Sequence, residues 1–561
     1  MRRFFFVGSV FFLLNFVLTA LATQARAFTI TSDPQYIVMN FSEINELNWA
    51  APEEEWQSTI KPKILNQLRQ LKTALPPGTI NRKLAWSTLQ EYMNTPMDAP
   101  STDSYYVKKI RRILEITEEE NLPVFLPLNG FQWWDEMPEL YNWWDPDGTH
   151  TPAIFFNRQR TKDFKQRFIA GYNPNNQWNV EWQNFTTPMK LNYRNWGGGG
   201  FRLAPPPNLV SPTYQTVQKG RLSAIVTELV TVLNRWQQEG KSELFAGITI
   251  GTEISLNASA TPKDEFEPYG YRSMQDLLCP QNQPTCGTTT HWKQSDLERY
   301  REAVVQTYLN DFTRLASRMG IPKQRIYTHV WSESEPGDPR YTNYANAAFT
   351  LYSRPGMSFY GHAENPLSFS LWENALTKNG NPSWGAVEYS AGTSEESWKK
   401  GLTNTLDSQT PAKVLVIYNW TQHKDTGAIP ALTTELKKIP IEPLCAIPEV
   451  LPMDPNGMVG SEIHWQLFPN QGTSGTIESL KLHMSPGLTP TKTSEQAIES
   501  VLGKTSATLS IPSGVYSWYL ELSGCNGTRK TTSEPRTLVV PMLLPETPLP
   551  FWVEFILTHQ R

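Results

Sequence analysis

The sequence contains little that would support metal or nucleic-acid binding. It has eight histidines in 561 residues, and its formal net charge is only −4. Lysine and arginine are mixed with aspartate and glutamate along the chain, so no basic stripe for a phosphate backbone is present. Clustered histidine ligands and an HExxH motif are also absent from the sequence. We therefore predict no metal, no cofactor and no nucleic-acid partner.

Long apolar runs are absent after the N-terminus, so no later segment is expected to span a bilayer. At the N-terminus, Arg2 and Arg3 precede a mostly apolar stretch from Phe4 to Leu21. Ala25-Arg26-Ala27 then offers a small-x-small cleavage site. This order predicts a secretory signal peptide over residues 1–27, with an uncleaved membrane anchor as the alternative. The expected mature protein is exported, periplasmic or extracellular, and has no membrane span.

Cysteine is scarce, with four residues in the chain. Cys279 and Cys286 form a local pair, and Cys445 and Cys525 form a distant one. In an exported protein an even number of cysteines favours disulfides. The first pair would close a short loop and the second would staple the C-terminal region. A zinc site is the alternative, but the Cys and His spacing fits no ligand pattern.

Aromatic residues, in contrast, are abundant, with 20 Trp and 21 Tyr. Core packing accounts for many of them. Trp and Tyr also suit a surface that is flat, apolar and still wettable, and sugar-binding clefts are such surfaces.

Eight short apolar runs, separated mostly by helix-like segments, predict a (β/α)₈ TIM barrel, with a doubly wound open sheet as the alternative. Amphipathic helices are predicted at Val107–Glu120, Tyr214–Gln238 and Asp296–Met319. The apolar runs are Tyr36–Phe41, Ile80–Trp86, Pro123–Leu128, Phe245–Ile250, Arg325–Trp331, Met357–Tyr360, Gly385–Tyr389 and Val414–Tyr418.

The domain plan has two further features. The connection after the third run, from residue 129 to 244, is too long for an ordinary loop, and it leaves the barrel face where active sites are built.

After about residue 435 the pattern changes to prolines and alternating segments, which predict a small antiparallel β-sandwich. Its Ser513–Tyr519 stretch resembles late strands of fibronectin type III modules, and such a module either braces the barrel or binds carbohydrate. The predicted domains are therefore a barrel over 28–435 and a sandwich over 436–561.

Two of the predicted strands end in a glutamate. The fourth run leads into Gly251-Thr252-Glu253, and the seventh reads Trp384-Gly-Ala-Val-Glu388. Burying a carboxylate costs free energy unless it is paired or hydrogen-bonded. Two glutamates at the ends of buried strands therefore indicate a functional role. In a closed barrel these strands face each other across the mouth. One carboxyl could donate a proton to a leaving oxygen while the other attacks, as glycoside hydrolysis requires.

Each glutamate also has a structural interpretation as the partner of a barrel arginine. Glu333 and Glu335, which follow the fifth run, are rival carboxylates in the same mouth, but they sit in a more polar loop, which favours a solvated role.

Glutamates at the ends of strands four and seven resemble the clan A (4/7) superfamily of retaining glycoside hydrolases. The resemblance spans roughly residues 30–430 and implies that Glu253 is the acid/base and Glu388 the nucleophile. It also implies that Tyr360 contacts the nucleophile and that Trp420 floors the sugar site. Many clan members carry Asn before the acid/base, whereas this chain has Thr252, which indicates an outlying family or another sugar preference. The stretch from Arg202 to Pro212 is distantly similar to β-galactosidase-type members.

Further candidate substrate contacts lie in loops at the same face. The third-strand loop begins at Asn129 and contains Trp133-Trp134-Asp135 and then Trp143-Trp144-Asp145. These triplets predict stacking platforms with carboxylates beside them, although packing of a subdomain explains them equally well. Trp331, at the end of the fifth run, is a further candidate contact. His362, after the sixth run, is either a substrate contact or a packed loop histidine.

The sequence therefore predicts an exported glycoside hydrolase that acts on oligo- or polysaccharides. A non-catalytic carbohydrate-binding barrel and a metal-assisted hydrolase are the alternatives, since one fold hosts many chemistries.

Overall fold

The protein is described here from a computed structural model. The described residues are 33–95, 103–134, 136–141, 173–189, 192–195, 200–258, 267–278, 294–331, 343–438, 447–452, 458–459, 462–468, 477–487, 496–500, 506–509, 512, 514–525, 527, 529–533 and 535–540.

Eight parallel strands form a closed barrel. Each strand pairs with its neighbour, and the circle closes because β2 pairs with both β1 and β4. Closure excludes the open sheet, and each predicted apolar run overlaps one barrel strand, which confirms the predicted (β/α)₈ fold. The strands are β1 (Gln35–Asn40), β2 (Arg82–Ser87), β4 (Val124–Asn129), β7 (Phe245–Ile254), β10 (Ile326–Val330), β11 (Gly356–Phe359), β12 (Trp384–Tyr389) and β13 (Ala412–Ile417). The short β3 (Gln90–Glu91) adds to β4 at the rim.

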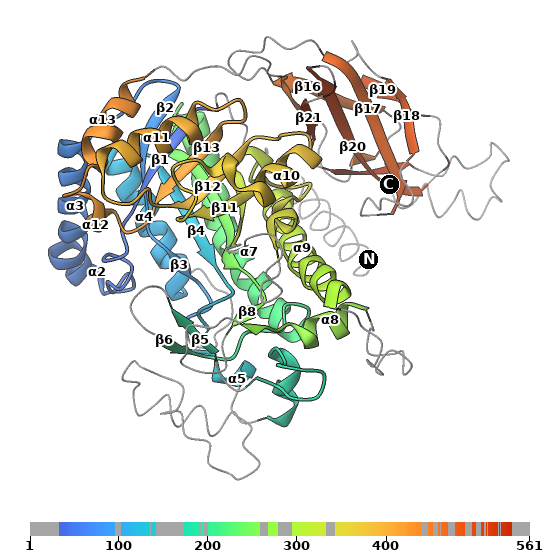
Figure 1. The fold of residues 1–561 in the computed structure, drawn as a ribbon, viewed down its shortest axis with the longest axis horizontal. Coiled ribbons are helices and arrows are strands. Elements are labelled where there is room, and N and C mark those ends of the chain that lie inside the picture. Colours follow the sequence, from blue (N-terminus) through green and yellow to red (C-terminus); the bar gives the residue numbers. More distant parts are fainter. Residues whose placement is uncertain are drawn as a thin grey trace, which may run out of the picture. The chain divides into compact units, whose positions relative to one another are not determined.

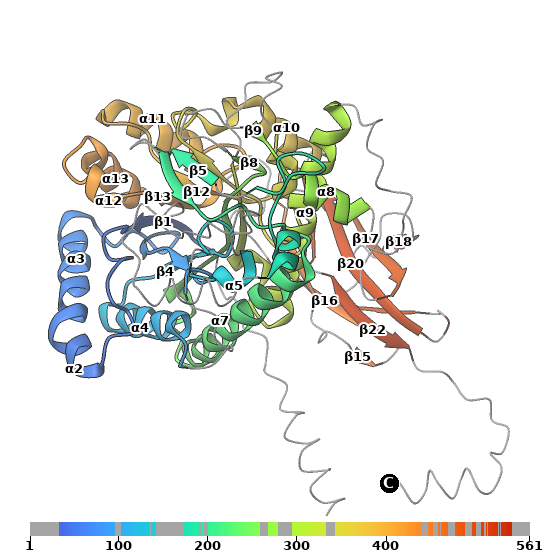
Figure 2. The same ribbon diagram turned by 90° about the horizontal axis from the view of Figure 1, so that it is seen from below.

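Helices surround this barrel (Figures 1 and 2). The three helices predicted from amphipathic periodicity are present as α4, α7 and α9. The longer helices are α3 (Lys61–Ala74), α4 (Tyr105–Glu120), α7 (Pro212–Gln238), α8 (Tyr271–Leu278), α9 (Gln294–Arg318), α10 (Ser370–Lys378), α11 (Glu395–Leu406) and α13 (Ala428–Lys437). Shorter helices are α2 (Glu53–Glu55), α5 (Pro138–Tyr141) and α12 (Trp420–His423).

Alternate residues along the strands supply two separate apolar clusters. One face packs against the helices in a large cluster that includes Ile37, Trp86 and Leu126. The opposite face fills the barrel interior, which explains why the strands read as continuous apolar runs. The interior cluster is Tyr36, Val38, Ala85, Phe125, Ala246, Tyr327, Val387, Val414 and Val416.

Buried ionic networks hold the N-terminal ends of the strands. Arg82, at the start of β2, is fully buried and contacts Asp407 at 2.5 Å and also Glu435. Asp33 is paired with Arg325 at 2.8 Å and with Arg354 at 2.7 Å. This end of a TIM barrel commonly serves stability, which leaves the opposite rim for function.

The long segment after the third barrel strand is an insertion with its own small elements. It contains α5 and the hairpin of β5 (Asn192–Asn195) with β6 (Gly200–Leu203) before α7 begins. Glu181, in this insertion, is fully buried and accepts a hydrogen bond from Ser273 of α8. The insertion is thus tied to a barrel helix.

The chain divides into two compact units. The first comprises residues 1–378 and 383–441, and the second comprises residues 379–382 and 442–561. The second contains two small β-sheets around a core with Trp465 and Trp518, antiparallel apart from one short parallel pair. Its strands are β14 (Glu449–Pro452), β15 (Met458–Val459), β16 (Glu462–Phe468), β17 (Ile477–Pro486), β18 (Gln496–Ser500), β19 (Ser506–Thr508), β20 (Gly514–Gly524), β21 (Arg529–Thr532) and β22 (Arg536–Val540).

Several sequence predictions fall on other residues. The predicted signal peptide (1–27), Cys279, Cys286 and Cys445 lie outside the described residues, while Cys525 is disulfide-bonded. Among the described helices, none has the length and apolarity needed to cross a bilayer.

Candidate active site

Glu253 and Glu388 project at the C-terminal rim of the barrel because the strands that carry them are irregular. The pairing of β7 with β10 jumps from Ile250 to Ile254, and Glu253 has a positive φ of 46°. The pairing of β12 also shifts next to Glu388. Bulges of this kind re-aim side chains at barrel rims, and a left-handed non-glycine residue marks a strained position. The chain therefore bends to bring both carboxyls into the mouth.

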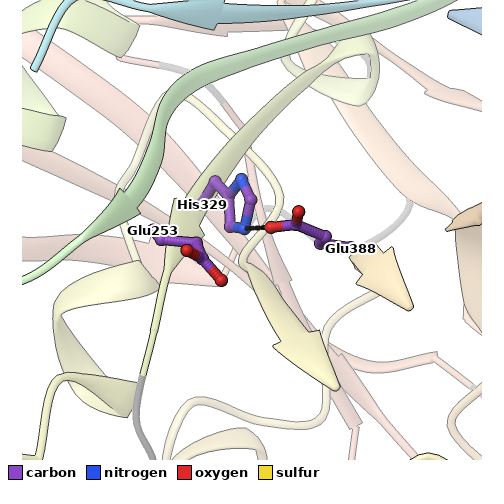
Figure 3. A group of neighbouring side chains, drawn as sticks. All are labelled: Glu253, His329 and Glu388. Carbon is purple, nitrogen blue, oxygen red and sulfur yellow. Dashed lines mark ion pairs between the residues drawn. The ribbon is translucent and has the colours of Figure 1, made fainter. Parts of the chain in front are cut away.

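The two carboxyl groups converge on each other and on His329 of β10. One donor atom from each of the three side chains lies within 4.8 Å of the others. Figure 3 shows the three side chains pointing toward a common centre. Glu253 is 9% exposed, Glu388 8% and His329 2%. Residues from three separate strands thus form one buried cluster.

A serine hydroxyl connects these three groups. Ser358 Oγ of β11 lies 3.1 Å from Glu253 Oε1, 3.3 Å from Glu388 Oε2 and 2.7 Å from His329 Nε2. His329 Nε2 is also 3.5 Å from Glu388 Oε2. Burial lowers the pKa of His329 to about 3, so this last contact joins a neutral imidazole to a carboxyl group and is no ion pair at neutral pH.

The electrostatics of the site favour one shared proton. Burial raises the pKa of Glu388 well above its ordinary value, and the neighbouring charge of Glu253 raises it further. Hydrogen bonds from the hydroxyls of Tyr360 and Ser358 act in the opposite direction. Glu253 and Glu388 are also hydrogen-bonded to each other. Since two carboxylates can bond to each other only through a proton, the pair carries one proton and one negative charge.

Glu253, His329 and Glu388 also carry oxygen and nitrogen atoms of the kinds that bind divalent metals. The position between them, however, is taken by the Ser358 hydroxyl, which is within hydrogen-bonding distance of an atom of each. A cation bound to all three would have to displace this hydroxyl. We therefore describe the group as a hydrogen-bonded cluster.

Two tyrosines flank the carboxyl pair. Tyr360 is 41% exposed and donates its hydroxyl to Glu388, and Tyr418 is 37% exposed. Burial raises the pKa of Tyr418, and the charges of Glu388 and Glu253 add to this effect. These partly exposed rings form the rim around the buried acids.

The other aromatic candidates are more buried. Trp420 is 4% exposed and Trp331 is 8% exposed, and Trp420 packs in the main core. Trp134 is fully buried, donates its indole N–H to the carbonyl of Pro205 at 2.9 Å, and packs on Tyr141 and Tyr214. It offers no open face to a sugar, which corrects the stacking prediction for this residue. Its neighbour Trp133 is partly exposed.

The polar candidates occupy varied positions. Asn129 ends β4, and its Oδ1 accepts the backbone N–H groups of Phe131 and Gln132, while its buried Nδ2 has no partner within the described chain. Thr252 Oγ1, beside Glu253, is likewise buried without a described partner. His362 stacks on Phe369 with ring centroids 4.7 Å apart. Asp135, Trp143, Trp144, Asp145, Glu333 and Glu335 lie outside the described residues.

Sequence reasoning missed His329, Ser358 and Tyr418. A usable signal was present, because side chains two residues apart on a strand share a face. His329 is two residues from Tyr327, which fills the barrel interior, and Ser358 is two residues before Tyr360.

Comparison with known proteins gives only distant similarities. The chain matches no protein-family model and no curated protein. Aligned solved structures include an endo-β-1,4-mannanase from Thermotoga petrophila, with 10% identity over 91% of this chain and 99% of that chain and a TM-score of 0.33. Another is a tri-modular GH5 endo-β-1,4-glucanase from Bacillus licheniformis, with 9% identity, coverage of 91% and 78%, and a TM-score of 0.29. Scores this low carry no argument, so the fold assignment rests on the strand pairing.

Proposed function

We propose that the protein is an exported glycoside hydrolase that cleaves β-linked oligo- or polysaccharides with retention of configuration. The observation that carries this proposal is the pair of buried carboxyls, Glu253 and Glu388, with oxygens within 4.8 Å of each other at the barrel mouth. Retaining enzymes hold their two carboxyls about 5–5.5 Å apart, whereas inverting enzymes leave about 6.5–9.5 Å for a water molecule. The short separation supports double displacement.

The hydrogen bonds support a division of roles between the two acids. Glu388 accepts a hydrogen bond from Tyr360, whereas the Ser358 hydroxyl is within reach of both acids, and a hydroxyl donor favours the ionised form of its acceptor. Burial and Glu253 raise the pKa of Glu388, and the Tyr360 hydroxyl opposes this effect. From the Tyr360 hydrogen bond and the resemblance to clan A, we assign the negative charge to Glu388 as the nucleophile and the shared proton to Glu253 as the acid. The preference for β-linkages and the export follow from the resemblance to clan A and from the N-terminal signal pattern.

In this mechanism Glu388 attacks the anomeric carbon while Glu253 gives its proton to the departing glycosidic oxygen. A covalent glycosyl ester forms on Glu388. Glu253, now ionised, then removes a proton from water, which attacks the anomeric carbon and releases Glu388.

The test is hydrolysis of aryl β-galactoside, β-glucoside, β-mannoside and β-xyloside by wild-type protein, E253Q and E388Q. We expect turnover of at least one substrate by the wild type and a severe loss in both variants. E181Q provides a matched control, because Glu181 is another buried glutamate outside the pair. Sugar binding without turnover of these or any polysaccharide substrate would instead favour a non-catalytic binding protein.

A further inference from the structure

The hydroxyl group of Ser358 can serve only one carboxyl at a time. Its oxygen is within hydrogen-bonding distance of Glu253, Glu388 and His329, and the side chain is 5% exposed. A serine hydroxyl carries one proton and two lone pairs. It therefore donates to one of the three groups and accepts from another.

His329 fixes the direction of these bonds. The imidazole is neutral, since burial lowers its pKa to about 3, and so it carries one N–H. Its Nδ1 is buried and has no partner among the described residues. An orphaned buried N–H is rarer in proteins than an unused acceptor, so the proton belongs on Nε2. Nε2–H then donates to Ser358 Oγ, and the serine proton is left to point at a carboxyl.

We propose that the Ser358 hydroxyl is a positioning group that donates to whichever of Glu253 and Glu388 is ionised, turning about its Cβ–Oγ bond as the charge moves between them. This inference rests on the proposed function. The ionisable groups that face the hydroxyl are Glu253 from β7, His329 from β10 and Glu388 from β12, with Tyr360 and Tyr418 on the rim.

The reaction moves the charge from one glutamate to the other and back. In the first step the Glu388 carboxylate bonds to the anomeric carbon, the glycosidic C–O bond breaks, and the Glu253 proton goes to the leaving oxygen. Glu388 is then a neutral ester and Glu253 is the carboxylate. In the second step a water molecule gives a proton to Glu253, and the water oxygen bonds to the anomeric carbon. The ester bond to Glu388 breaks, which restores the Glu388 carboxylate.

Ser358 can follow this transfer without moving a heavy atom. Its oxygen is nearly equidistant from the two carboxyls, at 3.1 and 3.3 Å. His329 Nε2–H continues to donate to Oγ in both orientations, which keeps the oxygen in place. A hydrogen bond to the charged partner is thus available in each half of the cycle, and such bonds are the stronger kind.

Tyr360 provides the contrast. Its hydroxyl donates to Glu388, so it stabilises that carboxylate in the free enzyme. In the glycosyl-enzyme, Glu388 is an ester and the charge is on Glu253. Tyr360 is therefore expected to influence only the ionisation of Glu388 in the free enzyme. Ser358 is expected to influence that ionisation and also the ionisation of Glu253 in the glycosyl-enzyme.

The test compares S358A and Y360F through two pH profiles. The acid limb of kcat/KM reports protonation of Glu388 in the free enzyme. The acid limb of kcat on a 2,4-dinitrophenyl glycoside, whose fast departure makes deglycosylation limiting, reports protonation of Glu253 in the intermediate. We expect S358A to shift both limbs upward, by about one pH unit, and Y360F to shift only the first. The sugar is the one that the wild type hydrolyses.

S358T supplies the rescue, because it keeps a hydroxyl, and we expect both limbs to return toward their wild-type positions. In S358A the His329 N–H still has Glu388 Oε2 at 3.5 Å, so the limb that reports Glu253 is the cleaner readout. A purely structural role would lower the rates without moving either limb. An unmoved deglycosylation limb in S358A, or an equal shift of it in Y360F, would overturn the proposal.

A second measurement does not depend on activity. Nitrogen NMR of ¹⁵N-histidine-labelled protein, with the His329 signals identified by their loss in H329Q, reads the tautomer directly. We expect a neutral Nε2–H imidazole that does not titrate between about pH 8 and 5. A proton on Nδ1 would mean that Ser358 donates to His329, and the proposal would fail even if the protein is a glycosidase. Absence of turnover by the wild type would instead reject the proposed function, while this tautomer still decides the hydrogen-bond direction.

Discussion

Tyr360 donates a hydrogen bond from the barrel rim to Glu388, although Tyr360 is 41% exposed and Glu388 only 8%. This bond brings a polar group to the buried carboxyl to which we assign the negative charge of the free enzyme. Glu253 receives no such bond from Tyr360, because a phenol has a single proton. The two acids therefore differ in environment even though they lie side by side.

Removing the Tyr360 hydroxyl is expected to weaken the nucleophile. For Y360F we predict a loss of about 10- to 150-fold in kcat/KM, the range for a hydrogen bond to a charged group. Because the lost bond lowered the pKa of Glu388, the acid limb should move to higher pH. Steady-state kinetics across pH measure both effects. A limb that moves to lower pH would contradict the assignment of the charge to Glu388.

Glu181 should make stability depend on pH. Burial raises the pKa of Glu181 to about 7 from an ordinary value of 4.5, with hydrogen bonds from Ser273 opposing the effect. Between these two values the folded state binds more protons than the unfolded state, so wild-type stability falls as pH rises. E181Q keeps an acceptor for Ser273 without the charge. We predict that E181Q gains up to about 3 kcal/mol over wild type between pH 4.5 and 7, and little more above that.

Urea unfolding at pH 4, 5.5, 7 and 8 tests this prediction. A gap between E181Q and wild type that stays constant with pH would show that Glu181 is not the buried titrating group.

Substitution in the ion-pair network of Arg82, at the N-terminal end of the barrel strands, should lower the free energy of unfolding. Substituting Met for Arg82 leaves Asp407 and Glu435 buried without their main cation. Lys438 still contacts both carboxylates, so we expect the lower end of the usual range, a loss of about 3 kcal/mol. K438M is the matched control. Because Lys438 is 37% exposed, that variant should lose no more than about 1 kcal/mol. Equal effects of the two substitutions would contradict this reading.

Trp134 and Tyr418 should respond in opposite ways to truncation. W134A removes a fully buried indole from the main hydrophobic core and should cost about 3–5 kcal/mol of unfolding free energy. Tyr418 is 37% exposed beside the carboxyl pair, so Y418A should raise KM while leaving thermal stability nearly unchanged. Thermal melts together with kinetics separate the two. A stable W134A with an altered KM would return Trp134 to the sugar-binding surface.

The barrel was predictable because its strands are buried on both faces. Runs such as Pro123–Leu128 and Val414–Tyr418 have no polar alternation, and each overlaps a barrel strand. The glutamate positions followed from the same rule, since Glu253 and Glu388 stand out at the ends of such runs. Whether the two act as the acid and nucleophile remains a proposal.

The rest of the cluster could be predicted only in part from residue spacing. The bulge that gives Glu253 its positive φ changes which side chains face the mouth, so periodicity fails there. Period-2 spacing places His329 on the same strand face as Tyr327 and Ser358 on the same face as Tyr360, but only the adjacency of the strands shows that they meet the acids. For Trp134 the sequence left a stacking platform and subdomain packing open, because a Trp pair is typical of both, and its full burial in the structure decides for packing.

The most direct test of the central claim is chemical rescue by azide. In E388A the nucleophile is removed, and azide should attack the substrate itself to give a glycosyl azide of inverted configuration. In E253A azide should instead attack the glycosyl ester and give the retained configuration. Recovery of activity with these two products is the predicted result. A folded E388A protein that forms no glycosyl azide from an activated substrate would contradict the assignment of Glu388 as the nucleophile.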